Sequence, residues 1–143
     1  MVSLIRDKLD KELSKEDPTK LFELLDQLGK GSFGCVYRAR RCAAHICSYL
    51  IIRYATAELV AIKLIPIEAT DECAEDIRKE IMTLKDCDHP NIVKYYGTYF
   101  KDDHLWIVME YCGGGSVSDI CQTLEHGLTE QQIAVVIRET LKV

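Results

Sequence analysis

The chain has 143 residues, and 48% of them are hydrophobic, which suits one domain with a buried core. Its 18 basic and 23 acidic residues give a net charge of −5. No basic stripe with interleaved aromatic residues is present, so we expect no nucleic-acid partner. No apolar run reaches the roughly 18 residues of a membrane span, and the N-terminus is too charged for a signal peptide. These features together predict a cytoplasmic protein.

The seven cysteines are scattered along the chain, with no C-x-x-C pair and no histidine at metal-ligand spacing. In a cytoplasmic protein such thiols stay reduced. We therefore expect them to be mostly small core residues, and we predict no metal site.

Residues 1–19 form a charged leader. Within it, Ile5, Leu9 and Leu13 recur at near-helical spacing, which predicts a short helix that ends at Pro18.

Three glycines in the stretch LGKGSFGCVY, residues 28–37, have the spacing G-x-G-x-x-G. A dinucleotide-binding loop with this spacing opens directly into a helix. Here the loop is followed by Cys-Val-Tyr, which favours a strand, and FELLDQLG before it is also typical of a strand. Residues 22–40 are therefore predicted to form a hairpin whose backbone N–H groups can approach phosphate. On these residues alone, glycines that serve only the turn remain an alternative.

Residues 41–56 form an unusual insert, RCAAHICSYLIIRYAT, after this hairpin. Its apolar side chains at an exposed connection predict a segment that aggregates or binds a partner. A misassigned exon boundary and a docking insert both remain open.

The next strand, predicted over residues 58–67, is almost continuously apolar and carries Lys63 as the one charge inside it. A buried ammonium group costs several kcal/mol unless an anion lies beside it. A helix predicted over residues 70–87 offers Glu80 next to its apolar stripe. We expect Glu80 to pair with Lys63, although a lysine that reaches water from an edge strand is the alternative.

Two further strands, residues 89–100 and 104–112, are joined by the polar turn KDD. A glycine hinge then precedes a helix over residues 117–126, which Gly127 can cap. A last helix, residues 130–143, has a capping box formed by Thr129 and Gln132. The predicted fold class is α+β: a five-stranded antiparallel sheet with one main helix, followed by a hinge and further helices.

Four motifs occur in a fixed order: GKGSFGCV, VAIK, Glu80 in a helix, and HPN followed by the strand WIVMEYC. In this order they resemble the N-terminal lobe of a eukaryotic protein kinase. The stretches VKYYGTYF and LWIVMEYCGGGSVSDI are similar to the sterile-twenty-like serine/threonine kinases, especially the germinal-centre group. The resemblance covers residues 20–40 and 57–143, so that residues 20–112 match the N-lobe and residues 113–143 match the hinge and a partial C-lobe.

The resemblance implies that ATP binds between the hairpin and the hinge and that Lys63 and Glu80 form the catalytic ion pair. It places adenine beside apolar side chains, with a gatekeeper methionine and two backbone contacts in the hinge, and the ribose near a serine. The implied nucleotide-binding residues are Leu28, Gly29, Lys30, Gly31, Ser32, Phe33, Gly34, Cys35, Val36, Ala61, Lys63, Met109, Glu110, Cys112 and Ser116.

The catalytic loop H-R-D-x-x-x-x-N and the D-F-G metal motif of the family do not occur in these residues. The resemblance therefore implies that Mg²⁺ belongs to a complete domain and that the chain as given does not transfer phosphate. The expected function is the ATP-binding N-terminal part of a serine/threonine kinase that phosphorylates proteins in intracellular signalling. A non-catalytic interaction or regulatory module, which binds a signalling partner, is the alternative.

Overall fold

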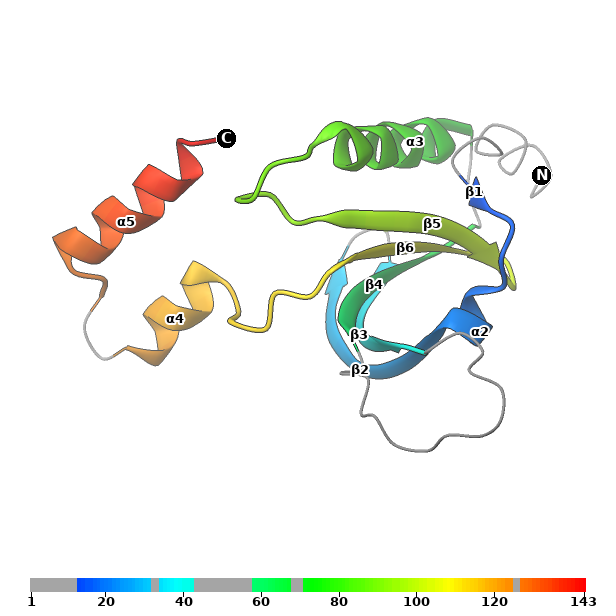
Figure 1. The fold of residues 1–143 in the computed structure, drawn as a ribbon, viewed down its shortest axis with the longest axis horizontal. Helices are drawn as coiled ribbons and strands as arrows, with labels where there is room; N and C mark the ends of the chain where they lie inside the picture. Colours follow the sequence, from blue (N-terminus) through cyan, green and yellow to red (C-terminus); the bar gives the residue numbers. More distant parts are fainter. Residues whose placement is uncertain (1–12, 32–33, 43–57, 68–70, 125–126) are drawn as a thin grey trace, which may run out of the picture.

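A computed structural model describes residues 13–31, 34–42, 58–67, 71–124 and 127–143 (Figure 1). Most of the predicted leader helix, most of the insert and the tip of the Gly-rich hairpin lie outside these residues. Along the chain, the elements are β1 (Leu13–Ser14), α2 (Pro18–Leu21), β2 (Phe22–Gly31), β3 (Gly34–Arg41), β4 (Leu59–Pro66), α3 (Asp71–Asp86), β5 (Tyr95–Lys101), β6 (His104–Glu110), α4 (Val117–Thr123) and α5 (Glu130–Thr140).

The α+β class is confirmed, with one addition to the sheet. Strands β2, β3, β4, β6 and β5 form antiparallel pairs, as predicted. The sheet nevertheless has six strands, in the order β1-β5-β6-β4-β3-β2, because β1 pairs in parallel with β5. An edge strand exposes unpaired N–H and C=O groups, and the leader supplies partners for those of β5.

The predicted ends of two helices, one in the leader and one directly after the hinge, are wrong. The leader helix was expected to end at Pro18, whereas α2 begins there, since proline is well suited to the first turn of a helix. Likewise, α4 ends at Thr123 and not at Gly127. Leu124 leaves the helix in an extended conformation, so no left-handed glycine is needed to end it.

The strand predicted from residue 89 begins only at Tyr95. Before it, the HPN motif forms a turn in which the His89 Nδ1 atom accepts a hydrogen bond from the Asn91 N–H at 3.1 Å. The Ile92 N–H also donates to the His89 carbonyl oxygen at 3.0 Å. Pro90 has no N–H for a sheet ladder, so the chain turns here and pairs later.

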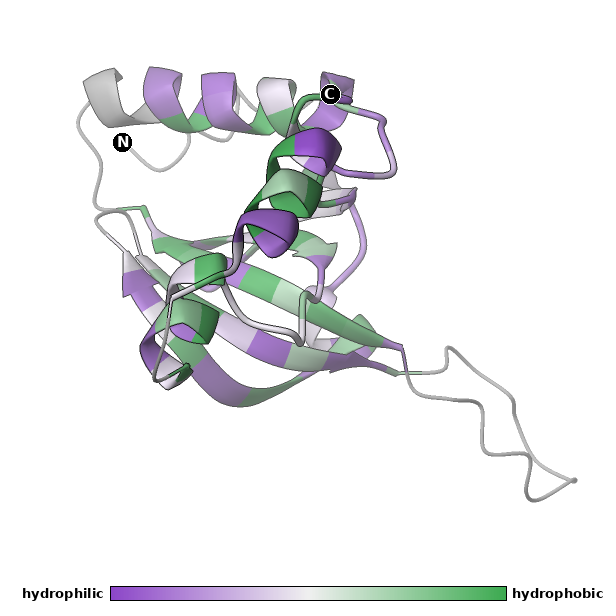
Figure 2. Cartoon of the chain, turned by 90° about the vertical axis from the view of Figure 1, so that its left-hand side faces the viewer, coloured by the Kyte–Doolittle hydropathy of each residue, from purple (hydrophilic) through white to green (hydrophobic). Residues whose placement is uncertain are grey.

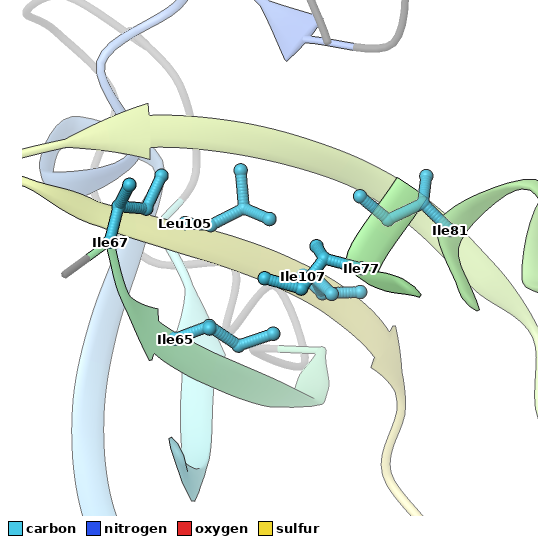
Figure 3. Close-up of a cluster of buried hydrophobic side chains, with 6 residues drawn as sticks. All are labelled: Ile65, Ile67, Ile77, Ile81, Leu105 and Ile107. Atoms are coloured by element: carbon cyan, nitrogen blue, oxygen red, sulfur yellow. The ribbon is translucent and has the colours of Figure 1, made fainter. Parts of the chain in front are cut away.

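The core consists of two clusters on opposite faces of the sheet, because successive side chains of a strand point to opposite faces. The first cluster lies between α3 and the sheet (Figure 3) and contains Ile65, Ile67, Ile77, Ile81, Leu105 and Ile107. The second contains Phe22, Ala39, Val60, Ile62, Trp106 and Val108. Each fully buried isoleucine or leucine stabilises the fold by about 1.5–3 kcal/mol.

Helices α4 and α5 follow the hinge and lie beyond one end of the sheet (Figure 1). Hydrophobic segments of both helices are visible in Figure 2, and none of their described residues is buried. Their exposed apolar residues include Val117, Ile120, Ile133, Val136 and Ile137, and Leu124 directly after α4 is exposed as well. The described residues therefore leave the apolar sides of α4 and α5 uncovered.

Besides the pairing of β1, the leader has a second contact with β5, at the C-terminal end of that strand. The Lys101 ammonium group donates to the Asp17 carboxylate at 3.1 Å, and Asp17 also caps α2 by accepting from the Thr19 N–H at 3.1 Å. The hydrogen bonds from the Thr19 hydroxyl and from Lys101 lower the pKa of Asp17 from 3.8 to about 2. The ionised carboxylate therefore binds the leader to the sheet.

We expect acid to release this anchor. The pKa of Asp17 is lower in the folded state, so its contribution to stability is present above about pH 3.8 and is lost as the pH falls through about 2. Amide exchange at Leu13 and Ser14, followed by NMR from about pH 5 to about pH 2, should show the loss of protection. In Asp17→Asn, which keeps a capping side chain, this acid-dependent step should be absent.

Candidate functional site

The charge in the middle of the sheet has a partner. Lys63 lies at the centre of β4, where Val36 of β3 and Ile107 of β6 are its neighbours in register. Its ammonium group donates to the Glu80 Oε1 atom at 2.6 Å. The Lys63 side chain is 17% exposed and that of Glu80 is 37% exposed, so the ion pair lies at the border between the core and solvent.

The position of Glu80 follows from the packing of α3. Ile77 and Ile81 are buried against the sheet, at 3% and 0% exposure, and they fix which side of the helix faces β4. Glu80 directly precedes Ile81, at the margin of this apolar side. The predicted meeting of Glu80 and Lys63 is therefore seen in the structure, and the first cluster holds the two in place.

The glycines of the hairpin differ in what surrounds them. Gly34 has a φ of +156°, and a Cβ atom placed on it would overlap the backbone carbonyl of Leu64. By contrast, a Cβ on Gly29 would meet no atom within 4 Å. Gly34 is thus required for the close approach of β3 to β4. The backbone at Gly29 is open to a ligand.

The antiparallel pairing of β2 with β3 places the other predicted hairpin residues opposite one another. Gly29 pairs with Val36, Lys30 with Cys35, and Gly31 with Gly34. Leu28 is 48% exposed on β2. The remaining two predicted residues, Ser32 and Phe33, lie outside the described residues.

A small apolar side chain lies beside the ion pair. Ala61, two residues before Lys63 on β4, is 8% exposed and pairs with Met109 of β6. Met109 is half-buried and packs against the first cluster. The structure therefore places both residues on adjacent strands that lead towards the hinge.

One backbone N–H group of the hinge is free for a ligand. The Glu110 N–H donates to the Lys94 carbonyl oxygen at 2.8 Å, and the Glu110 carboxylate accepts from the Lys94 N–H at 3.1 Å. Cys112 is exposed, and its N–H has no acceptor among the residues that the structure describes. An adenine ring carries hydrogen-bond acceptors, so a free N–H group suits it.

Ser116 is the N-cap of α4, a function that the sequence did not reveal. Its hydroxyl group donates to the Asp119 carboxylate at 2.7 Å and accepts from the Asp119 N–H at 3.1 Å. Hydrogen bonds from the Ser116 hydroxyl and backbone lower the pKa of Asp119. A ribose contact at Ser116 would have to share a hydroxyl that already stabilises the helix.

Asn91 also has a contact that the sequence did not predict. Its side-chain amide donates to the Glu139 carbonyl oxygen at 2.6 Å and to the Glu139 carboxylate at 3.1 Å. The turn before β5 is thereby joined to α5, which lies 48 residues later in the chain. Only its place in the HPN motif could have singled out Asn91.

The described part of the chain contains no group of three or more histidine, cysteine, aspartate or glutamate side chains that could hold a metal ion. None of its helices is long and apolar enough to cross a membrane.

Comparison with known proteins agrees with this arrangement. The family model "Protein kinase domain" matches residues 22–143. The chain is 47% identical over 134 residues to "Serine/threonine-protein kinase 1" of Arabidopsis thaliana, covering 94% of this chain and 15% of that protein. It is 44% identical over 141 residues to "Serine/threonine-protein kinase dst1" of Dictyostelium discoideum, covering 99% of this chain and 17% of that protein.

The chain thus spans less than a fifth of the length of either relative. The match covers both the hairpin and the Lys63–Glu80 pair, and it continues through the hinge into α5. The chain belongs to the protein kinase family.

Proposed function

We propose that the chain is the ATP-binding part of a serine/threonine protein kinase of the sterile-twenty-like group. The observation that carries this proposal is the Lys63–Glu80 ion pair, held at 2.6 Å between β4 and α3 beside the Gly-rich hairpin. Serine/threonine specificity is supported by the names of the two relatives. The subgroup is supported by the resemblance of the hinge stretch, residues 105–120.

Each part of the site has a role towards ATP. Glu80 holds the ammonium group of Lys63, which presents a positive charge to the α- and β-phosphates. The open backbone at Gly29 allows the hairpin to cover the phosphates. In this proposal, Leu28, Val36 and Ala61 offer apolar surface to adenine, while the Glu110 carbonyl and the Cys112 N–H bind its edge.

The chain binds and orients the nucleotide, and ATP when bound supplies the phosphoryl group. In the family, a catalytic aspartate and two magnesium ligands lie in motifs that do not occur in these 143 residues. Positioning and charge stabilisation account for most of the catalysis of phosphoryl transfer. This chain contributes to both through its hairpin, its hinge and the Lys63–Glu80 ion pair. We further propose protein substrates in the cytoplasm.

Phosphoryl transfer by the full-length protein tests the proposal. The protein is incubated with γ-labelled ATP, Mg²⁺ and a general protein substrate, and the labelled amino acids are identified after hydrolysis. We expect phosphoserine and phosphothreonine. Label found only on tyrosine would contradict the specificity. Binding of an ATP analogue without any transfer would favour the non-catalytic module instead.

A further inference from the structure

The leader completes the first core cluster. In the parallel pairing of β1 with β5, Leu13 is the partner of Thr98 and Ser14 is the partner of Tyr99. Leu13 is half-buried and packs against the cluster that contains Ile77 and Ile81 of α3. In Figure 1, β1 lies on the side of the sheet that α3 covers.

The chain is fastened to the sheet again after this contact. Before α2, Asp17 is bound to Lys101 at the end of β5, and the two side chains are 29% and 36% exposed. At the end of α2, Leu21 packs against the second cluster and Phe22 belongs to it, on the opposite face of the sheet. The segment from Leu13 to Asp17 is thus held against the edge of β5 at each end.

The first cluster, against which Leu13 packs, also determines where Glu80 lies. Ile77 and Ile81, on either side of Glu80 in sequence, are the buried contacts of α3 with the sheet. Anything that loosens the packing around them allows α3 to move away from β4. The carboxylate of Glu80 would then leave its position 2.6 Å from the Lys63 ammonium group.

We propose that residues 13–17 form a strap that holds α3 against the sheet and so keeps Glu80 on Lys63, with Leu13 as a positioning residue. The catalytic consequence of the strap rests on the proposed function. Its effect on α3 does not, because that effect depends only on packing.

The test compares Leu13→Ala with Leu21→Ala in the full-length protein. Both variants truncate a half-buried leucine near the start of the described chain, but Leu21 packs against the second cluster, away from α3. Two quantities are measured: amide hydrogen exchange of peptides covering residues 71–86, and kcat and KM for ATP.

We expect Leu13→Ala to raise the exchange rate of α3 by about tenfold relative to β3 and β4, because the cluster that holds α3 loses a packing partner. It should lower kcat by a similar factor, about tenfold, with a smaller change in KM. Leu21→Ala should leave α3 exchange at the wild-type rate. Leu13→Met, which keeps the volume, should restore both values.

A further variant tests the strap without removing a core side chain, so that general unfolding of the domain cannot account for its effect. Lys101→Met removes the ion pair with Asp17 but no core residue, and we expect it to raise α3 exchange by about two- to threefold. The strap is ruled out if Leu13→Ala changes α3 exchange and kcat no more than Leu21→Ala does. If the wild-type protein transfers no phosphate, the proposed function fails, and α3 exchange alone then decides whether the strap exists.

Discussion

Replacement of Lys63 by methionine in the full-length protein is expected to lower kcat for phosphoryl transfer by about 10²- to 10³-fold, as the loss of one charged transition-state contact does elsewhere. Methionine keeps an unbranched apolar chain in β4 but has no charge for the phosphates. Glu80 would lose its cation, yet its side chain is 37% exposed and can be hydrated. The thermal stability of the domain should therefore change little.

The measurement is a steady-state kinase assay beside a thermal unfolding curve. Lys79→Met is the matched control, since this lysine lies on the same helix, α3, with a side chain that is 68% exposed. It should retain wild-type kcat. Glu80→Gln combined with Lys63→Met should be no worse than Lys63→Met alone, because the two residues act as one unit. Activity of Lys63→Met close to wild type would refute the role of this lysine.

Replacement of Gly34 by alanine is expected to destabilise the sheet by about 2–5 kcal/mol, from overpacking and backbone strain together. A Cβ there would overlap the Leu64 carbonyl, and the φ of +156° is unfavourable for any residue with a side chain. Strands β3 and β4 would have to separate where they pair near Cys35. Because β4 carries Lys63, the ion pair should be disturbed as well.

Hydrogen exchange of peptides from β3 and β4, with the unfolding temperature, measures this effect. Gly29→Ala is the control, since a Cβ at Gly29 has no atom within 4 Å and that strand residue needs no left-handed conformation. Its stability should stay within about 1 kcal/mol of wild type, as for most surface substitutions. It should weaken the binding of an ATP analogue. Equal loss of stability in both variants would contradict the packing role of Gly34.

Much of the fold could be predicted from the sequence, because local patterns determine it. The almost continuously apolar stretches LVAIKLIP and HLWIVME indicate strands with two buried faces, and both faces are buried. The stripe formed by Ile77 and Ile81 predicts a helix that covers a sheet, as α3 does. The capping box of Thr129 and Gln132 is also present as predicted.

The candidate site was partly predictable for the same reason. A lysine inside an apolar strand requires an anion, and Glu80 was the carboxylate beside the apolar stripe of the next helix. The N-capping role of Ser116 and the bond from Asn91 to Glu139 were not foreseen. Hydroxyl and amide groups find partners in many folds, and the sequence does not say which partner is near.

By itself, the sequence determined the five antiparallel strands and the main helix, and it predicted the pairing of Lys63 with Glu80 against the alternative of a lysine that reaches water. Only the tertiary structure showed that the leader adds a sixth strand and that Asp17 binds Lys101, a residue 84 positions away. Parallel pairing at a sheet edge leaves no periodicity in two residues such as Leu13 and Ser14. The edge of β5 exists only once the sheet has formed, so the place where the leader binds is a property of the folded chain.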